Sequence, residues 1–303
     1  MIPAAYLGDV LTLLSSLCFA VSNITVARGA RPGAEDNGAF VSLLITTAIA
    51  GLCWLVLGVA RGFEPVTARA LAWFAAAGVL TAFVGRVFFY ASIEKLGAMR
   101  SSTMKRLIPF FAVSLGVGVL GEPVTGGMLA GMALIVASFG FLLAGARGGR
   151  SAGPARERGL NSGYVYGPIS ALGYASGYLL RKMGLADAHD ALLGAAVGCL
   201  VGALMFVAAA AFRDSYARAV RATFERASPW LLTAGVMSSM GQIFYFAALN
   251  QNPMSRVALV SSVEVFITLF LGAVFLRRSE SVTPALVVAA LLGFAGTAAV
   301  IGF

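Results

Sequence analysis

The sequence has little charge for its length. Of its 303 residues, 12% are Asp, Glu, Lys or Arg and 59% are hydrophobic, whereas a soluble domain carries about 25% charged residues. A water-soluble core cannot enclose this much apolar surface, so lipid is expected to surround most of the chain.

Histidine and cysteine are also scarce. His189 is the single histidine, and Cys18, Cys53 and Cys199 lie in apolar runs without CxxC spacing. This composition excludes the common zinc and paired-histidine motifs, and no Walker-type glycine-rich loop is present. We therefore expect no catalytic residue, no metal and no cofactor. A membrane-embedded lipid-modifying enzyme would need a cluster of acids or histidines at one interface, and the sequence offers none.

Long apolar runs dominate the sequence. Each is close to the roughly 20 residues that a helix needs to span a bilayer, and lipid offers the backbone of a non-helical span no hydrogen-bond partners. The sequence thus predicts an all-α integral membrane protein with ten transmembrane helices. The predicted segments are 6–28, 38–60, 70–94, 98–120, 126–146, 161–183, 190–212, 229–250, 254–276 and 282–303.

The chain contains an internal repeat. The decamer GRVFFYASIE at 85–94 returns 156 positions later as GQIFYFAALN at 241–250, and EPVT at 122–125 is echoed by ESVT at 280–283. SSLCFAVSN near Ser15 aligns more loosely with SALGYASGY near Ser170. A repeat of this kind defines the architecture.

The repeat divides the chain into three parts. We expect an N-terminal five-helix repeat at 1–146, a polar linker at 147–160 and a C-terminal five-helix repeat at 161–303. Five crossings are an odd number, so the second half must enter the membrane from the opposite side. The prediction is a pair of inverted repeats around a central cavity, as in many secondary transporters.

Loop charge predicts an orientation. The net charge is +9, but Lys and Arg gather in short clusters between apolar runs, as in membrane-protein loops, so we expect no nucleic-acid partner. The loops after odd-numbered segments hold more Lys and Arg than the others. The positive-inside rule places these loops in the cytoplasm and both termini outside.

Glu264 is the sharpest functional candidate. It lies ten residues into the ninth segment, about 15 Å deep at 1.5 Å per residue, and polar groups inside spans are costly enough to indicate function. Ser261 and Thr268 share its helix face by their spacing. This stripe suits the binding of an ammonium group or a proton; the alternative is a structural carboxylate paired with an Arg or with backbone donors.

Two other groups of basic residues have open roles. Arg86 lies mid-span with Tyr90 one turn further on, and it suits either a bidentate contact to a substrate carboxylate or a structural pair with Glu264. Its repeat counterpart Gln242 keeps hydrogen-bonding capacity without the charge. Lys105 and the neighbouring Arg106 suit either snorkelling to the interface or an anion site.

A polar and aromatic stripe completes the candidates. Ser170, Tyr174 and Tyr178 follow four-residue spacing in the sixth segment, and Asn23 shares a face of the first segment with Ser16. Such a wall suits amphipathic solutes, although tyrosine also serves in interfacial belts.

The ten spans, the two halves and the LGEPVT motif with its echo ESVT resemble the drug/metabolite transporter superfamily, in its ten-helix EamA-type branch. Within this branch the chain is similar to bacterial amino-acid exporters, including exporters of aromatic amino acids. The resemblance implies a cavity between spans 1, 3 and 4 of one half and spans 6, 8 and 9 of the other. The cavity residues it implies are Asn23, Arg86, Tyr90, Lys105, Tyr174, Tyr178, Gln242 and Glu264. It also implies termini in the cytoplasm, opposite to the loop-charge prediction.

We therefore expect a multi-pass transporter of the bacterial inner membrane that exports small amphipathic metabolites, amino acids above all, by alternating access. Its expected partners are the substrate, membrane lipid and H⁺, and it is expected to be a monomer. The alternatives are a carrier of organic anions or phosphorylated metabolites and a broad drug exporter.

Overall fold

The computed structural model describes residues 4–29, 38–85, 88, 89, 92, 107–146, 157–225, 228–275 and 284–302, and every regular element in these ranges is a helix. The helices are α1 (Ala4–Gly29), α2 (Ala39–Arg61), α3 (Ala68–Gly78), the π-helical η1 (Val79–Gly85), α6 (Ile108–Leu120), α7 (Gly126–Ala146), α8 (Glu157–Asp187), α9 (Ala191–Ala210), α10 (Asp214–Glu225), α11 (Pro229–Gln251), α12 (Met254–Ser261), α13 (Glu264–Phe275) and α14 (Pro284–Gly302).

Six helical stretches are long and apolar enough to cross a membrane. They are Tyr6–Gly29, Ala39–Arg61, Ala68–Gly85, Ala191–Ala210, Pro229–Gln251 and Met254–Gly272. The described apolar parts of α6, α7 and α14 are shorter, and α8 carries more polar residues. An all-helical membrane architecture is therefore confirmed, whereas the number of ten spans stays a prediction.

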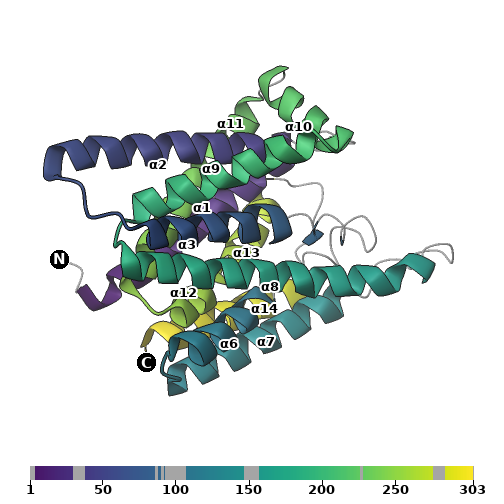
Figure 1. Ribbon diagram of the computed structural model, residues 1–303. Coiled ribbons are helices and arrows are strands. Elements are labelled where there is room, and N and C mark those ends of the chain that lie inside the picture. Colours follow the sequence, from purple (N-terminus) through teal and green to yellow (C-terminus); the bar gives the residue numbers. More distant parts are fainter. Residues whose placement is uncertain are drawn as a thin grey trace.

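The helices pack in two related series. α2, α9, α3, α8 and α6 follow one another from the top to the bottom of Figure 1, and each contacts the next. The repeat makes α1 the counterpart of α8, α2 that of α9, α3 that of α11, and α6 that of α12–α13. Replacing each helix of the first series by its counterpart gives α9, α2, α11, α1 and α12–α13, and these also contact one another in that order. This exchange of contacts is the packing expected of two repeats related by a pseudo-two-fold axis.

Counterpart helices run in opposite directions. Asp9 near the start of α1 and Lys182 near the end of α8 both bind Asn252, which follows α11. Arg69 at the start of α3 binds Asp187 at the end of α8, so α3 begins at the end of the bundle where α11 finishes. We call this end, where Asp9, Asn252 and Ile301 meet through Arg256, the N/C end.

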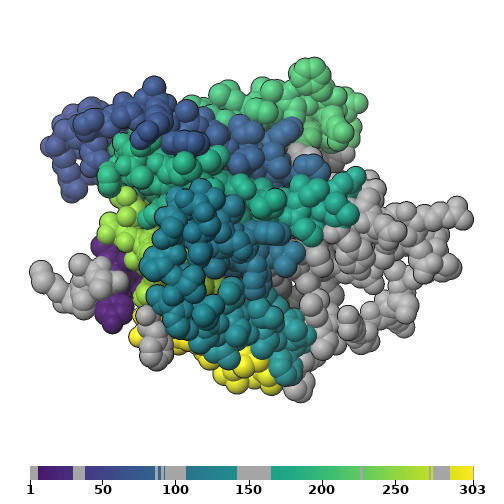
Figure 2. All heavy atoms as spheres, turned by 60° about the horizontal axis from the view of Figure 1, so that its bottom comes forward, coloured from purple at the N-terminus to yellow at the C-terminus, as the bar shows by residue number. Residues whose placement is uncertain are grey.

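The remaining counterparts are also antiparallel. Gly51 of α2 lies against Ala196 of α9, while the earlier Leu43 lies against the later Gly202. In the α7–α14 pair, the Ser138 hydroxyl donates to the Ala289 carbonyl over 2.6 Å. Figure 2 shows α14, in yellow, at the surface beside teal residues, and its neighbour there is α7. The antiparallel relation is the one that five spans per half require.

The first helix of each half hydrogen-bonds to the third helix of the other half. The Ser15 hydroxyl donates to the Gly241 carbonyl over 2.8 Å, and its counterpart Ser170 donates to the Gly85 carbonyl over 2.6 Å. These glycines are the first residues of the two repeated decamers. One turn beyond each serine, an aromatic ring covers the glycine, Phe19 on Gly241 and Tyr174 on Gly85. The weak repeat near Ser15 therefore corresponds to matching contacts.

The LGEPVT motif joins the two halves. Gly121 has φ 67° and ends α6 in the left-handed region, which favours glycine. The Glu122 carboxylate then accepts hydrogen bonds from the backbone N–H groups of Met254 and Ser255 and from the Ser255 hydroxyl. A carboxylate at a helix N-terminus satisfies otherwise unpaired donors and favourably meets the helix dipole. Thr125 caps α7 in turn, accepting from the Met128 N–H over 3.1 Å.

Two features differ from the sequence-based expectation. The predicted ninth span is broken, because α12 ends at Ser261 and α13 starts at Glu264, with 3₁₀-type bonds from Ser262 to Leu259 and from Val263 to Val260 between them. α10 fills a region predicted to be a loop. It is amphipathic: Ala219 is buried, while Phe212, just before it, and Phe224 project from the protein.

The expected linker at 147–160 is described only from residue 157, where α8 begins. The boundaries of the two repeats therefore stay predictions.

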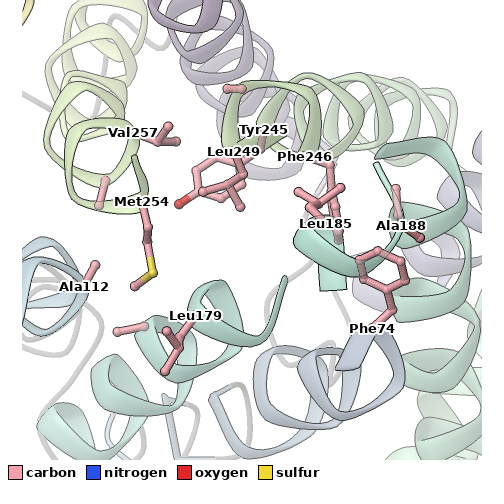
Figure 3. Packing of buried hydrophobic residues seen from close by; sticks show 14 of the residues in the cluster. Phe74, Ala112, Leu179, Leu185, Ala188, Tyr245, Phe246, Leu249, Met254 and Val257 are labelled. Atoms are coloured by element: carbon pink, nitrogen blue, oxygen red, sulfur yellow. The ribbon is translucent and has the colours of Figure 1, made fainter. Parts of the chain in front are cut away.

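The main buried cluster lies between the two halves. Phe74 of α3 and Phe246 of α11 have ring centroids 6.1 Å apart, and Leu185 of α8 packs in the same cluster. Figure 3 shows Phe246 pointing toward Leu185, with the hydroxyl of the adjacent Tyr245 directed away from it. The cluster holds α3, α8 and α11 together around the polar groups described next.

Candidate functional site

A carboxylate lies at the break in the ninth span. Glu264 is the first residue of α13, and its Oε1 accepts a hydrogen bond from the Asn23 Nδ2 of α1 over 2.9 Å. The same Asn23 amide lies 3.4 Å from the Thr268 hydroxyl. Asn23 and Glu264 belong to different halves of the chain, so this contact joins the halves. Broken helices at mid-membrane are typical of substrate and ion sites in transporters.

A buried arginine lies beside α11. Arg181 of α8 is 5% exposed, and its Nη1 donates to the Gln242 Oε1 over 2.9 Å. Its Nη2 lies 3.3 Å from the Thr81 hydroxyl in η1. The guanidinium carbon is 4.7 Å from the ring centroid of Phe246 and 5.4 Å from that of Tyr178. These contacts place a cation beside a π-helical segment, an irregularity that is frequent at functional sites.

Two tyrosines connect these regions. The rings of Tyr178 and Tyr245 have centroids 4.8 Å apart, and both phenols lie within electrostatic range of Arg181 and of Glu264. Tyr245 is 4% exposed, and among the described residues its hydroxyl has no hydrogen-bond partner. The site therefore combines a carboxylate, a guanidinium and aromatic surface, a set of groups that matches the chemistry of an amphipathic zwitterion.

The structure brings together some of the predicted residues. Asn23, Glu264 and Thr268 meet, and so do Tyr178 and Gln242, through Arg181. Tyr174 lies one turn away against Gly85. Ser261 turns back to its own helix and donates to the Ala258 carbonyl over 2.9 Å. Because of the helix break, Ser261 is not on a continuous helix with Glu264. Arg86, Tyr90 and Lys105 lie outside the described residues.

Arg181 is not among the residues singled out from the sequence, and it lies two residues before the end of the predicted segment 161–183. α8 continues to Asp187, so Arg181 lies inside the bundle. The spacing in the sequence could have identified it, because Arg181 follows Tyr178 by three residues and therefore lies on the same helix face as Tyr174 and Tyr178.

Asp9 was also missed. It is 2% exposed, accepts from the Asn252 amide over 2.8 Å and forms a two-point contact with Arg256, whose Nε and Nη2 lie 2.9 and 2.7 Å from its two oxygens. The Lys182 ammonium donates to the carbonyls of Leu249 and Asn252 at the end of α11. These contacts tie α1, α8, α11 and α12 together at the N/C end.

A pocket of about 400 Å³ opens beside this network, and Tyr6, Met128, Asn252, Arg256 and Ile301 are among the residues that line it. It lies at the N/C end and is separate from the Glu264 region. Within the described ranges no group of three His, Cys, Asp or Glu side chains is arranged to hold a metal.

Outside the spans, the Arg69–Asp187 pair marks the surface of the N/C end. The hydrogen bond from the Arg69 guanidinium lowers the pKa of the Asp187 carboxyl, because a nearby donor and positive charge favour the ionised form. Most of the Arg69 side chain is solvent-accessible, at 74%. Solvent screening makes such a pair weak compared with the buried Asp9–Arg256 pair.

Two antiparallel halves with a carboxylate at a helix break are an arrangement found in many secondary transporters. Comparison with known proteins agrees, because the EamA-like transporter family matches residues 6–144 and 161–302, once for each half. The chain belongs to this family of the drug/metabolite transporter superfamily and is a multi-pass membrane transporter. This family consists of transporters rather than enzymes.

A solved structure described as "Crystal structure of protein" is similar to this chain with a TM-score of 0.68. The match covers 96% of this chain and 95% of the other at 16% sequence identity, and at that identity it shows the fold alone. No curated protein matches the sequence significantly.

Proposed function

We propose that the protein exports amino acids and similar small amphipathic metabolites across a bacterial inner membrane by alternating access. The observation that carries this proposal is the 2.9 Å hydrogen bond between Asn23 and Glu264. It links the first helix of one half to the broken ninth span of the other. Movement of the halves relative to each other changes this contact, so occupancy of the carboxylate and the conformation of the bundle are coupled.

In this proposal Glu264 binds the substrate ammonium group in one access state and a proton in the other. A coupled carrier needs a group that exchanges its proton between states, and an acid within a span is the usual choice. The Asn23 amide occupies one carboxylate oxygen and is displaced when the ammonium group arrives. The aromatic rings of Tyr178 and Tyr245 offer the apolar side chain a surface on which to pack.

The described charges support a proposed orientation. The end opposite the N/C end carries Arg28 at the end of α1 and Arg213, Arg218 and Arg221 in and beside α10. In the proposed orientation this basic end faces the cytoplasm, which the positive-inside rule supports. Both termini then lie outside the cytoplasm.

Replacing Glu264 with Gln is expected to slow gradient-driven amino-acid flux at least tenfold, since a hydrogen bond to a charged group contributes about 1.5–3 kcal/mol and the change also removes the group that carries the proton. Flux is measured in proteoliposomes with and without a pH gradient. Wild-type flux should respond to the gradient, and the remaining flux of the Gln variant should not.

The matched control is Glu64→Gln, the same substitution at an exposed position in the loop before α3. This variant should behave as wild type. Equal wild-type rates with and without the gradient, together with full activity of Glu264→Gln, would remove the proton role. Competition by phosphate esters but not by amino acids would favour a carrier of organic anions or phosphorylated metabolites. Resistance to many unrelated drugs on overexpression would favour a broad drug exporter.

A further inference from the structure

Arg181 is a buried cation whose described contacts do not neutralise its charge. Its Nη atoms donate to the neutral oxygens of Gln242 and Thr81, and within the described ranges no carboxylate lies within ion-pair distance of it. Removing a guanidinium from water is unfavourable unless an anion or a full set of acceptors compensates. The aromatic faces of Phe246 and Tyr178 compensate only in part.

Three of the five N–H donors of Arg181 have no acceptor among the described residues. Arginine has five N–H donors in a planar fork, and the two described hydrogen bonds use one on each Nη. Nε is buried and has no acceptor among the described residues. The Nε–H and a neighbouring Nη–H together form the fork that binds a carboxylate at two points.

A second unused polar group lies close by. The buried hydroxyl of Tyr245 also has no partner among the described residues, and its ring packs on Tyr178, which in turn contacts the guanidinium. Gln242, Tyr245 and Phe246 are spaced by three and four residues along α11, so they share one helix face. Gln242 and Phe246 of this face contact Arg181. Two buried donors without described acceptors in one packed cluster indicate a ligand that supplies acceptor oxygens.

We propose that Arg181, assisted by the Tyr245 hydroxyl, binds the carboxylate group of the transported substrate. This inference rests on the proposed function and extends it, because it assigns the two charged ends of an amino acid to different helices. The ammonium group meets Glu264 of α13 and the carboxylate meets Arg181 of α8. The rings of Tyr178 and Tyr245, within electrostatic range of both charges, then contact the part of the substrate between its charged ends.

The test compares three ligands that differ only in their charged groups: phenylalanine, phenethylamine, which lacks the carboxylate, and 3-phenylpropanoate, which lacks the amine. Their dissociation constants are measured on the purified full-length protein in detergent. We expect Arg181→Gln to weaken binding of phenylalanine and 3-phenylpropanoate at least about tenfold. Binding of phenethylamine should stay unchanged and also shows that the variant is folded.

Arg181→Lys should recover part of the loss, because it restores the charge but not the fork. Arg61→Gln is the matched control, because Arg61 is solvent-exposed at the last position of α2. This variant should leave the dissociation constants of all three ligands unchanged. Full binding of both carboxylates by Arg181→Gln would overturn the inference while leaving amino-acid transport in place. Wild-type binding of 3-phenylpropanoate but not phenylalanine would refute amino acids as substrates and keep the role of Arg181. Failure of the wild type to bind either carboxylate would overturn both.

Discussion

Replacing Arg256 with Met is expected to lower the free energy of unfolding by about 3–5 kcal/mol, the usual cost of leaving a buried charge without its partner. Asp9 is almost fully buried and is held by Arg256 at two points. Met has a similar volume and no donor, so the change leaves the Asp9 carboxylate with only the Asn252 amide. The measurement is an SDS titration of the purified protein followed by circular dichroism.

A second ion pair provides the control. Arg69→Met breaks the Arg69–Asp187 pair, which has the same chemistry but a solvent-accessible guanidinium, and stability should change little. Combining Arg256→Met with Asp9→Asn should be less damaging than Arg256→Met alone, because no lone charge remains buried. Equal losses at the Arg69 and Arg256 positions would contradict a special role for the buried pair.

Replacing Gly78 with Ala is expected to destabilise the protein by about 3 kcal/mol, at the upper end of the range for overpacking. A Cβ at this position would lie 2.3 Å from the backbone oxygen of Gly198. Backbone cannot rotate away as a side chain can, so α3 and α9 would have to separate. The same SDS titration measures the loss.

Gly118→Ala is the matched control for this substitution. Gly118 also lies in a helix, but a Cβ there would meet nothing within 4 Å, so the change should stabilise the protein by up to about 1 kcal/mol through helix propensity. The two glycine variants are thus expected to move stability in opposite directions. A stabilised Gly78→Ala variant would show that the close approach of α3 and α9 tolerates a methyl group.

Much of the fold is readable from local sequence because lipid imposes simple requirements. Apolar runs must be helical, and an odd number of predicted spans per half predicts antiparallel halves. Even the loose alignment of Ser15 with Ser170 corresponds to matching hydrogen bonds to Gly241 and Gly85. The cost of placing a charge inside a span identifies Glu264 as a candidate from sequence alone. Its predicted association with Thr268 is present in the structure, because the Asn23 amide contacts both side chains.

The remainder depends on long-range packing. The break at Ser262–Val263 leaves no mark in a run of apolar residues, and η1 reads as ordinary helix. Arg181 lies where the apolar run ends, whereas the helix continues to Asp187, and its partners Gln242 and Thr81 lie far away in sequence. The amphipathic α10 is shorter than a span, so a search for spans passes over it.

The exchange of serine–glycine hydrogen bonds between halves has a consequence for assembly. Neither half by itself provides the acceptor for its own serine, because Ser15 bonds to Gly241 and Ser170 bonds to Gly85. Two fragments produced by cutting the chain in the linker would need to insert with opposite polarity before they could reassociate. A single fragment that carries both the serine and the glycine and inserts both ways would place the same donor and acceptor against its own inverted copy.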